Sequence, residues 1–163
     1  MTNLLHELLI ATLLVSLTVL SHLIGLDLLL SLTSLHLRRF QTAWVRLDRL
    51  LVPLGIVLGL FVLHGLEIWL YAFAYLALGV LQSLEQALYL SASTYSTLGE
   101  AHAALPETWR VLGALEAVNG MLLIGWSTAF LFHMINHLQV PPDRHPLPRG
   151  AISPEGRGKA PPD

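Results

Sequence analysis

Residues 82–108 read QSLEQALYLSASTYSTLGEAHAALPET, and this stretch separates two long apolar runs of the chain. Its first part places Leu84, Leu88 and Ser91 at helical spacing, which predicts about three turns of helix over residues 83–94. Residues 95–102, which follow, are rich in Ser, Thr and Gly. A short apolar helix before such a stretch predicts a re-entrant element, whose non-helical backbone is tolerated at membrane depth only beside protein or water. An interfacial helix that caps the bundle fits the same pattern.

The composition and three apolar runs indicate a membrane protein. Of the 163 residues, 54% are hydrophobic and only 12% are charged, whereas a soluble domain carries about 25% charged residues. Residues 4–37, 50–81 and 109–140 form apolar runs, and about 20 apolar residues suffice for a helix to cross a bilayer. The sequence therefore predicts an all-α membrane protein with three transmembrane helices, and a re-entrant element is one of two interpretations of the segment between the second and third.

The positions of the charges divide the chain further. We expect a first transmembrane helix over residues 1–37, a basic cytoplasmic loop over 38–49 and a further membrane unit over 50–140 that contains the segment 82–108. Residues 141–163 are rich in Pro and Gly, which predicts a disordered cytoplasmic tail. Because basic residues favour the cytoplasm, the N-terminus is expected outside and the C-terminus inside. The basic residues that set this orientation are Arg38, Arg39, Arg46, Arg49, Arg144, Arg149, Arg157 and Lys159.

Several function classes are disfavoured by composition. Nine Lys and Arg against eleven Asp and Glu give a net charge of -2, which offers no basic field for a nucleic acid. The absence of cysteine excludes a disulfide scaffold, a thiol enzyme and a cysteine metal site. The sequence also contains no Gly-rich phosphate loop, HExxH motif or serine elbow, so we expect neither an enzyme nor a bound cofactor.

Polar residues within the apolar runs are the candidate internal sites. His64 and Glu67 lie three residues apart on the second run, and the first run offers His22, Ser21 and Thr18 as partners. For these residues a buried hydrogen bond or ion pair is favoured over ion translocation. On the third run, a helical projection predicts a pore-lining stripe. Its members are Asn119, Leu123, Phe130, His133 and His137.

His133 and His137 share a helix face, so they could bind Zn²⁺ or protons, although hydrogen bonding to interfacial water is the simpler interpretation.

Residues 87–99, ALYLSASTYSTLG, resemble the pore helix and filter entry of the potassium-channel pore-domain family, in particular its small bacterial two-pore-domain-like ion channels. The resemblance extends over residues 50–140 and includes HGLEIW at 64–69, WRVLGALEA at 109–117 and GWSTA at 125–129. It implies that residues 50–140 form a pore domain in which the segment 82–108 is the pore loop, a re-entrant pore helix and filter loop between the second and third transmembrane helices. It also implies a homotetramer of identical subunits in the inner membrane of a bacterium, with one pore loop per subunit around a shared axis. It also implies that Glu116 supports the pore loop from behind, beside His64 and Glu67.

The filter itself departs from the family pattern. The family sequence Thr-Val-Gly-Tyr-Gly-Asp corresponds here to Thr97, Leu98, Gly99, Glu100, Ala101 and His102. The Thr97 hydroxyl and the carbonyls of Thr97 and Leu98 could still coordinate K⁺. Ala101 replaces the second glycine, and a positive φ on alanine costs about 1 kcal/mol or more. A four-ion potassium filter is therefore not expected.

Glu100 offers a different chemistry for the same position. Four copies would form a carboxylate ring that attracts K⁺, Na⁺ and divalent cations. His102 could join Glu100 as a metal ligand or confer pH sensitivity.

Two functions remain open: a passive cation channel with altered selectivity, or a non-conducting pore-domain-like protein with a structural or metal- or proton-sensing role. A metal-ion transporter is a weaker third, because the chain shows neither repeated halves nor broken helices.

Overall fold

The computed structural model describes residues 2–39, 45–98 and 105–139, and every element within these ranges is a helix. The elements are α1 (Thr2–Arg39), α2 (Val45–Ala77), α3 (Leu84–Tyr95), the short 3₁₀ helix η1 (Glu107–Trp109) and α5 (Arg110–Gln139). Three helices, α1, α2 and α5, are long and apolar enough to cross a membrane. The prediction of three such helices is confirmed, and the structure is compatible with a multi-pass membrane protein.

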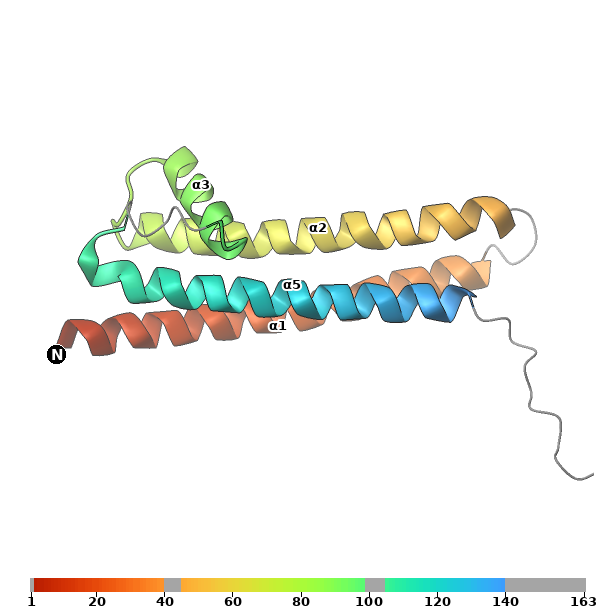
Figure 1. Ribbon diagram of the computed structural model, residues 1–163, viewed down its shortest axis with the longest axis horizontal. Coiled ribbons are helices and arrows are strands. Elements are labelled where there is room, and N and C mark those ends of the chain that lie inside the picture. The colour runs from red at the N-terminus through yellow and green to blue at the C-terminus, as the bar shows by residue number, and fades with distance from the viewer. Residues whose placement is uncertain (1, 40–44, 99–104, 140–163) are drawn as a thin grey trace, which may run out of the picture.

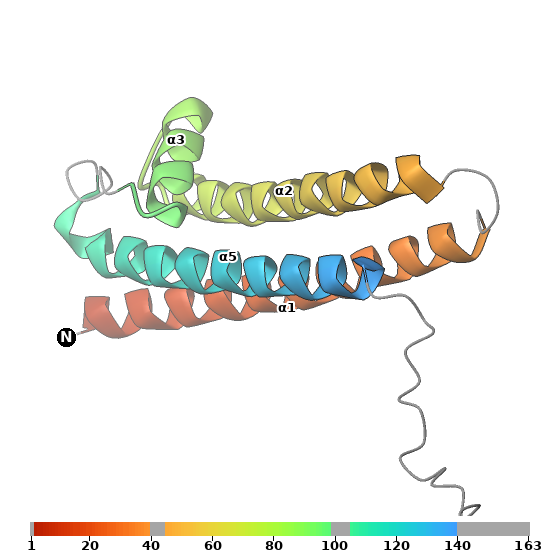
Figure 2. The same ribbon diagram turned by 45° about the vertical axis from the view of Figure 1, so that its right-hand side comes forward.

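The three long helices lie side by side, with α1 and α5 running in one direction and α2 in the other (Figures 1 and 2). The last turn of α1, the first turn of α2 and the last turn of α5 therefore share one end of the bundle. The short helix α3 packs against α2 and α5 on the side away from α1. It lies near the opposite end of the bundle, where α2 ends and α5 begins.

The helices extend into the segment that the sequence predicted to be a loop. α1 continues to Arg39 and α2 already begins at Val45. Pro53 therefore lies inside α2 and not in its first turn. A proline at this position removes one backbone hydrogen bond, a defect that transmembrane helices accommodate through neighbouring groups.

The interior of the bundle has two apolar layers with a polar layer between them. One apolar layer includes Leu14, Tyr75 and Leu112, and the other includes Leu26, Ile56 and Met134. Along each long helix, buried polar residues lie between these positions; they include Thr18, His22, Glu67, Glu116, Asn119 and Ser127. Glu7 and Thr33 of α1 are also buried but lie outside this interval. Large apolar side chains are instead exposed on the outer surface, as an apolar solvent would require.

Candidate functional site

The C-terminal end of α3 closes on a turn at a strained residue. The backbone N–H of Leu98 donates to the carbonyl of Ser93, and that of Thr97 donates to the carbonyl of Thr94, both at 2.9 Å. This pair of bonds is the Schellman pattern, whose left-handed position is usually occupied by glycine. Here Thr97 occupies it with a φ of 61°. A β-branched residue is an outlier in this conformation. The predicted filter therefore begins at a residue with a strained backbone.

α3 is fixed to both neighbouring helices by close contacts. The Ser91 hydroxyl donates to the carbonyl of Ile68 on α2 at 2.9 Å. On the other side, the backbone of Tyr95 lies so close to Gly120 of α5 that an added Cβ would stand 2.3 Å from the Tyr95 carbonyl oxygen. Only glycine permits this approach, because any larger residue would push α3 and α5 apart.

The polar layer is centred on the carboxylate of Glu67. His22 Nδ1 from α1 lies 2.9 Å from Glu67 Oε1, and His64 Nδ1 lies 3.1 Å from Oε2. The Tyr95 hydroxyl donates to the same Oε2 and lies 2.9 Å from His64 Nδ1. On the far side of both rings, Ser127 Oγ lies 3.3 Å from His22 Nε2 and 2.9 Å from His64 Nε2. This cluster of His22, His64, Glu67, Tyr95 and Ser127, here called the Glu67 cluster, joins all four packed helices.

A second buried carboxylate, Glu116, lies between α5, α2 and α3. Its two oxygens accept hydrogen bonds from the hydroxyls of Ser91 at 2.6 Å and Tyr75 at 2.5 Å. The side chain is fully buried. A buried carboxyl group is strongly destabilising unless such donors satisfy it, so these bonds orient α3 on the bundle.

The first helix supplies a polar partner at several levels of the bundle. Near its start, Glu7 accepts a hydrogen bond of 2.9 Å from the backbone N–H of Leu112 in the first turn of α5, where the helix dipole favours an acidic group. Further along, Thr18 Oγ1 accepts from Asn119 Nδ2 at 2.8 Å. The same Asn119 amide lies 3.2 Å from the Tyr71 hydroxyl. Within the described bundle, α1 therefore satisfies polar groups of the other helices in addition to its apolar packing.

Two of the predicted pore-lining residues lie inside the protomer. Asn119 and Leu123 are 4% and 2% exposed, and Asn119 bonds to Thr18 of α1 and Tyr71 of α2. In this protomer the two side chains are therefore not on the surface that could line a shared axis. Phe130 packs partly buried against the apolar layer around Leu26, whereas His133 is exposed. His137 belongs to α5, but its side chain lies outside the described part of the structure.

The predicted filter is described only at its beginning. Thr97 and Leu98 are exposed at the end of α3, with 77% of Leu98 accessible. Gly99, Glu100, Ala101 and His102 lie outside the described residues, as do the tail 141–163 and the centre of the basic segment.

Sequence reasoning identified His64, Glu67 and Glu116 as buried polar positions and named His22 as a partner, but it missed Tyr95, Tyr75 and Ser127. A signal for the contribution of α1 was available. Its buried residues recur every three or four positions, at Glu7, Ala11, Leu14, Thr18 and His22, and polar residues interrupt this otherwise apolar face.

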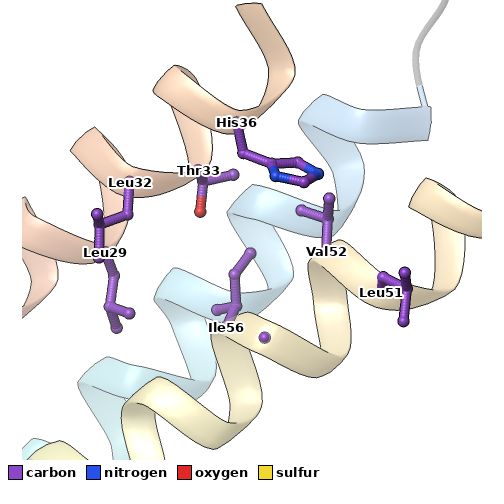
Figure 3. A pocket seen from close by; sticks show the side chains of 8 residues that line it. Leu29, Leu32, Thr33, His36, Leu51, Val52 and Ile56 are labelled. Carbon is purple, nitrogen blue, oxygen red and sulfur yellow. The ribbon is translucent and has the colours of Figure 1, made fainter. Parts of the chain in front are cut away.

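A pocket of about 280 Å³ lies between α1 and α2, at the end of the bundle opposite α3 (Figure 3). Its wall is mostly aliphatic, and it contains Thr33 and His36 as polar residues.

No family model, curated protein or solved structure matches the chain. The bundle and its polar layer therefore provide the evidence for function.

Proposed function

We propose that this protein is a passive cation channel related to potassium channels, formed by four copies that surround a shared axis. In this proposal each copy contributes α3 and the segment after it to the pore. The observation that carries the proposal is the depth at which α3 ends within the bundle.

That depth follows from the contacts of Tyr95. Its backbone packs against Gly120, which lies about ten residues beyond the start of α5, or ~15 Å at 1.5 Å per residue. Its hydroxyl reaches Glu67, which stands a similar distance before the end of α2. The hydrocarbon core of a bilayer is about 30 Å thick. If the end of α2 and the start of α5 mark one boundary of the hydrocarbon core, α3 therefore ends close to the middle of that core.

At this depth the following backbone needs a polar environment. Ser96 and Thr97 are exposed on the surface of the protomer, and irregular backbone does not face lipid. Other copies of the chain and a water-filled axis would provide the required surroundings. The negative end of the α3 dipole points to the same region, which favours a cation there.

Ion selection would depend on Thr97 and Leu98 at the inner end and on Glu100 farther out. Four Glu100 carboxylates would concentrate cations and bind divalent ions more tightly than monovalent ones. The proposed location is a bacterial inner membrane with the N-terminus outside. The arginines at the Arg39 end of α1 and at the start of α2 support this orientation.

The test is ion flux from liposomes that contain the purified full-length protein. We expect flux of K⁺ and Na⁺ that saturates with the permeant ion and is blocked by divalent cations. Glu100→Gln should weaken divalent block or change the K⁺ to Na⁺ ratio. Glu107→Gln is the matched control. Glu107 is an exposed carboxylate of η1, and its ion pair with Arg110 is long, at 3.6 Å.

A second variant addresses selectivity directly. The triple substitution Glu100→Tyr, Ala101→Gly and His102→Asp restores the last three residues of the family filter, and we expect it to raise selectivity for K⁺ over Na⁺. Absence of flux for every cation at every voltage, from protein shown to be helical and reconstituted, would refute the channel.

One observation favours the alternative, a non-conducting protein of the same architecture. The carbonyls of Ser93 and Thr94 are already occupied by backbone N–H groups of the turn, so the last turn of α3 does not offer them to an ion. A structural or sensing role predicts no flux, and the same liposome experiment separates the two functions.

A further inference from the structure

We propose that the Glu67 cluster is a binding site for a divalent transition-metal ion of the zinc type. His22, His64 and Glu67 would supply three ligands, and Tyr95 would supply the fourth. The site lies within one protomer, so it stands independently of the proposed channel function.

The donor atoms already converge on one point. One ligand atom from each of His22, His64 and Glu67 lies within 4.8 Å of the other two. The contacts between neighbouring donors measure 2.9 Å for His22 and Glu67 and 3.1 Å for His64 and Glu67. Metal–ligand distances of 2.0–2.1 Å at tetrahedral angles separate donors by about 3.3 Å. These two contacts would have to lengthen by only a few tenths of an ångström around an ion. The Tyr95 hydroxyl, which hydrogen-bonds to Glu67 Oε2 at closer range, would have to withdraw farther.

The number of protons that the Glu67 cluster can donate in hydrogen bonds also favours a bound metal ion. If both Nδ1 atoms donate to the Glu67 carboxylate, both Nε2 atoms become acceptors that face Ser127. A hydroxyl group has a single proton, so it can satisfy only one of them.

Metal binding at Nδ1 removes this deficit. Each Nε2 then carries the proton, and the Ser127 oxygen accepts from both rings through its two lone pairs. Histidine ligands commonly donate their second ring N–H in this way, which fixes the orientation of the ring.

The charges balance in the same arrangement. The side chains of His22, Glu67 and Tyr95 are at most 1% exposed, and a net charge is costly at such a depth. A coordinated tyrosine is a phenolate, and metal binding releases its proton to solvent. One carboxylate and one phenolate then neutralise a divalent ion. The side chain of His64 is 18% exposed, so the cluster reaches the surface of the protomer on that side.

The donor types select the kind of ion. Two imidazoles favour Zn²⁺ and Co²⁺, whereas Mg²⁺ and Ca²⁺ prefer oxygen ligands. Mg²⁺ should therefore leave the site unaffected.

The test uses tag-free, full-length protein in detergent after dialysis against a chelator. Titration with Co²⁺ should give the visible absorption of a tetrahedral complex at one ion per chain, and Zn²⁺ should abolish it by displacement. His22→Gln and Glu67→Gln should each lose the signal. Ser127→Ala removes only the group that orients both rings, so affinity should fall about 10- to 100-fold.

His133→Gln is the matched control, because this histidine is exposed and lies outside the Glu67 cluster; it should bind as the wild type does. Circular dichroism of each variant reports whether the helices are retained. The proposal is overturned if the wild type binds no stoichiometric Co²⁺ or Zn²⁺, which would mean that a proton completes the cluster instead. It is also overturned if folded His22→Gln and Glu67→Gln variants bind as tightly as the wild type. Flux is not measured, so failure of the metal site and failure of the channel are distinguishable.

Discussion

Gly120→Ala tests the contact that fixes the depth of α3. The added Cβ would stand 2.3 Å from the Tyr95 carbonyl oxygen and 2.9 Å from the Tyr95 carbonyl carbon, whereas ordinary contacts begin near 3.4 Å. The obstacle is backbone, so the two helices must separate by about 1 Å. Overpacking of this kind costs about 1–3 kcal/mol, and the higher helix propensity of alanine offsets up to about 1 kcal/mol of it.

Gly125→Ala is the matched control on the same helix. No atom lies within 4 Å of a Cβ added there, so this variant should keep the propensity gain without the clash. The two variants should therefore differ by about 1–3 kcal/mol, or ~2–12 °C in Tm for a chain of this size. Thermal unfolding in detergent, followed by the fluorescence of the four tryptophans, measures the difference. Equal stability of the two variants would show that α3 does not pack against Gly120.

Substitutions at three further positions test other contacts of the bundle. Thr97→Gly should raise the free energy of unfolding by about 1 kcal/mol, because glycine adopts the positive φ without strain. An unchanged or lower free energy of unfolding would contradict the positive φ at Thr97. Glu7→Ala should cost about 1–3 kcal/mol and speed hydrogen exchange at the Leu112 amide, because that N–H loses its acceptor. Glu7→Gln keeps an acceptor oxygen and should cost less stability. Equal losses of stability in the two variants would be evidence against the hydrogen bond from the Leu112 N–H to Glu7. Glu116→Gln should cost about 1–3 kcal/mol, because one of its two hydroxyl donors loses an acceptor; a Tm equal to that of the wild type would argue against the buried carboxylate.

The sequence determined the number and approximate extent of the helices. Each apolar run is long enough to form a spanning helix and contains few charges, so three long helices followed from composition alone. The 3.6-residue periodicity also located the short helix between the second and third, which the structure describes as Leu84–Tyr95.

Only the tertiary structure decided which polar residues meet. A helical projection gives the angles between Asn119, Leu123 and His133 on one helix, but it does not say which direction faces the neighbours. In α5 the apolar residues lie on all sides, so hydrophobicity does not orient the helix. The orientation is instead decided by hydrogen bonds across helices, such as the one from Asn119 to Thr18, because a polar group left in an apolar surrounding is unfavourable. The partners in these bonds are distant in the chain, so packing of the helices was needed to identify them.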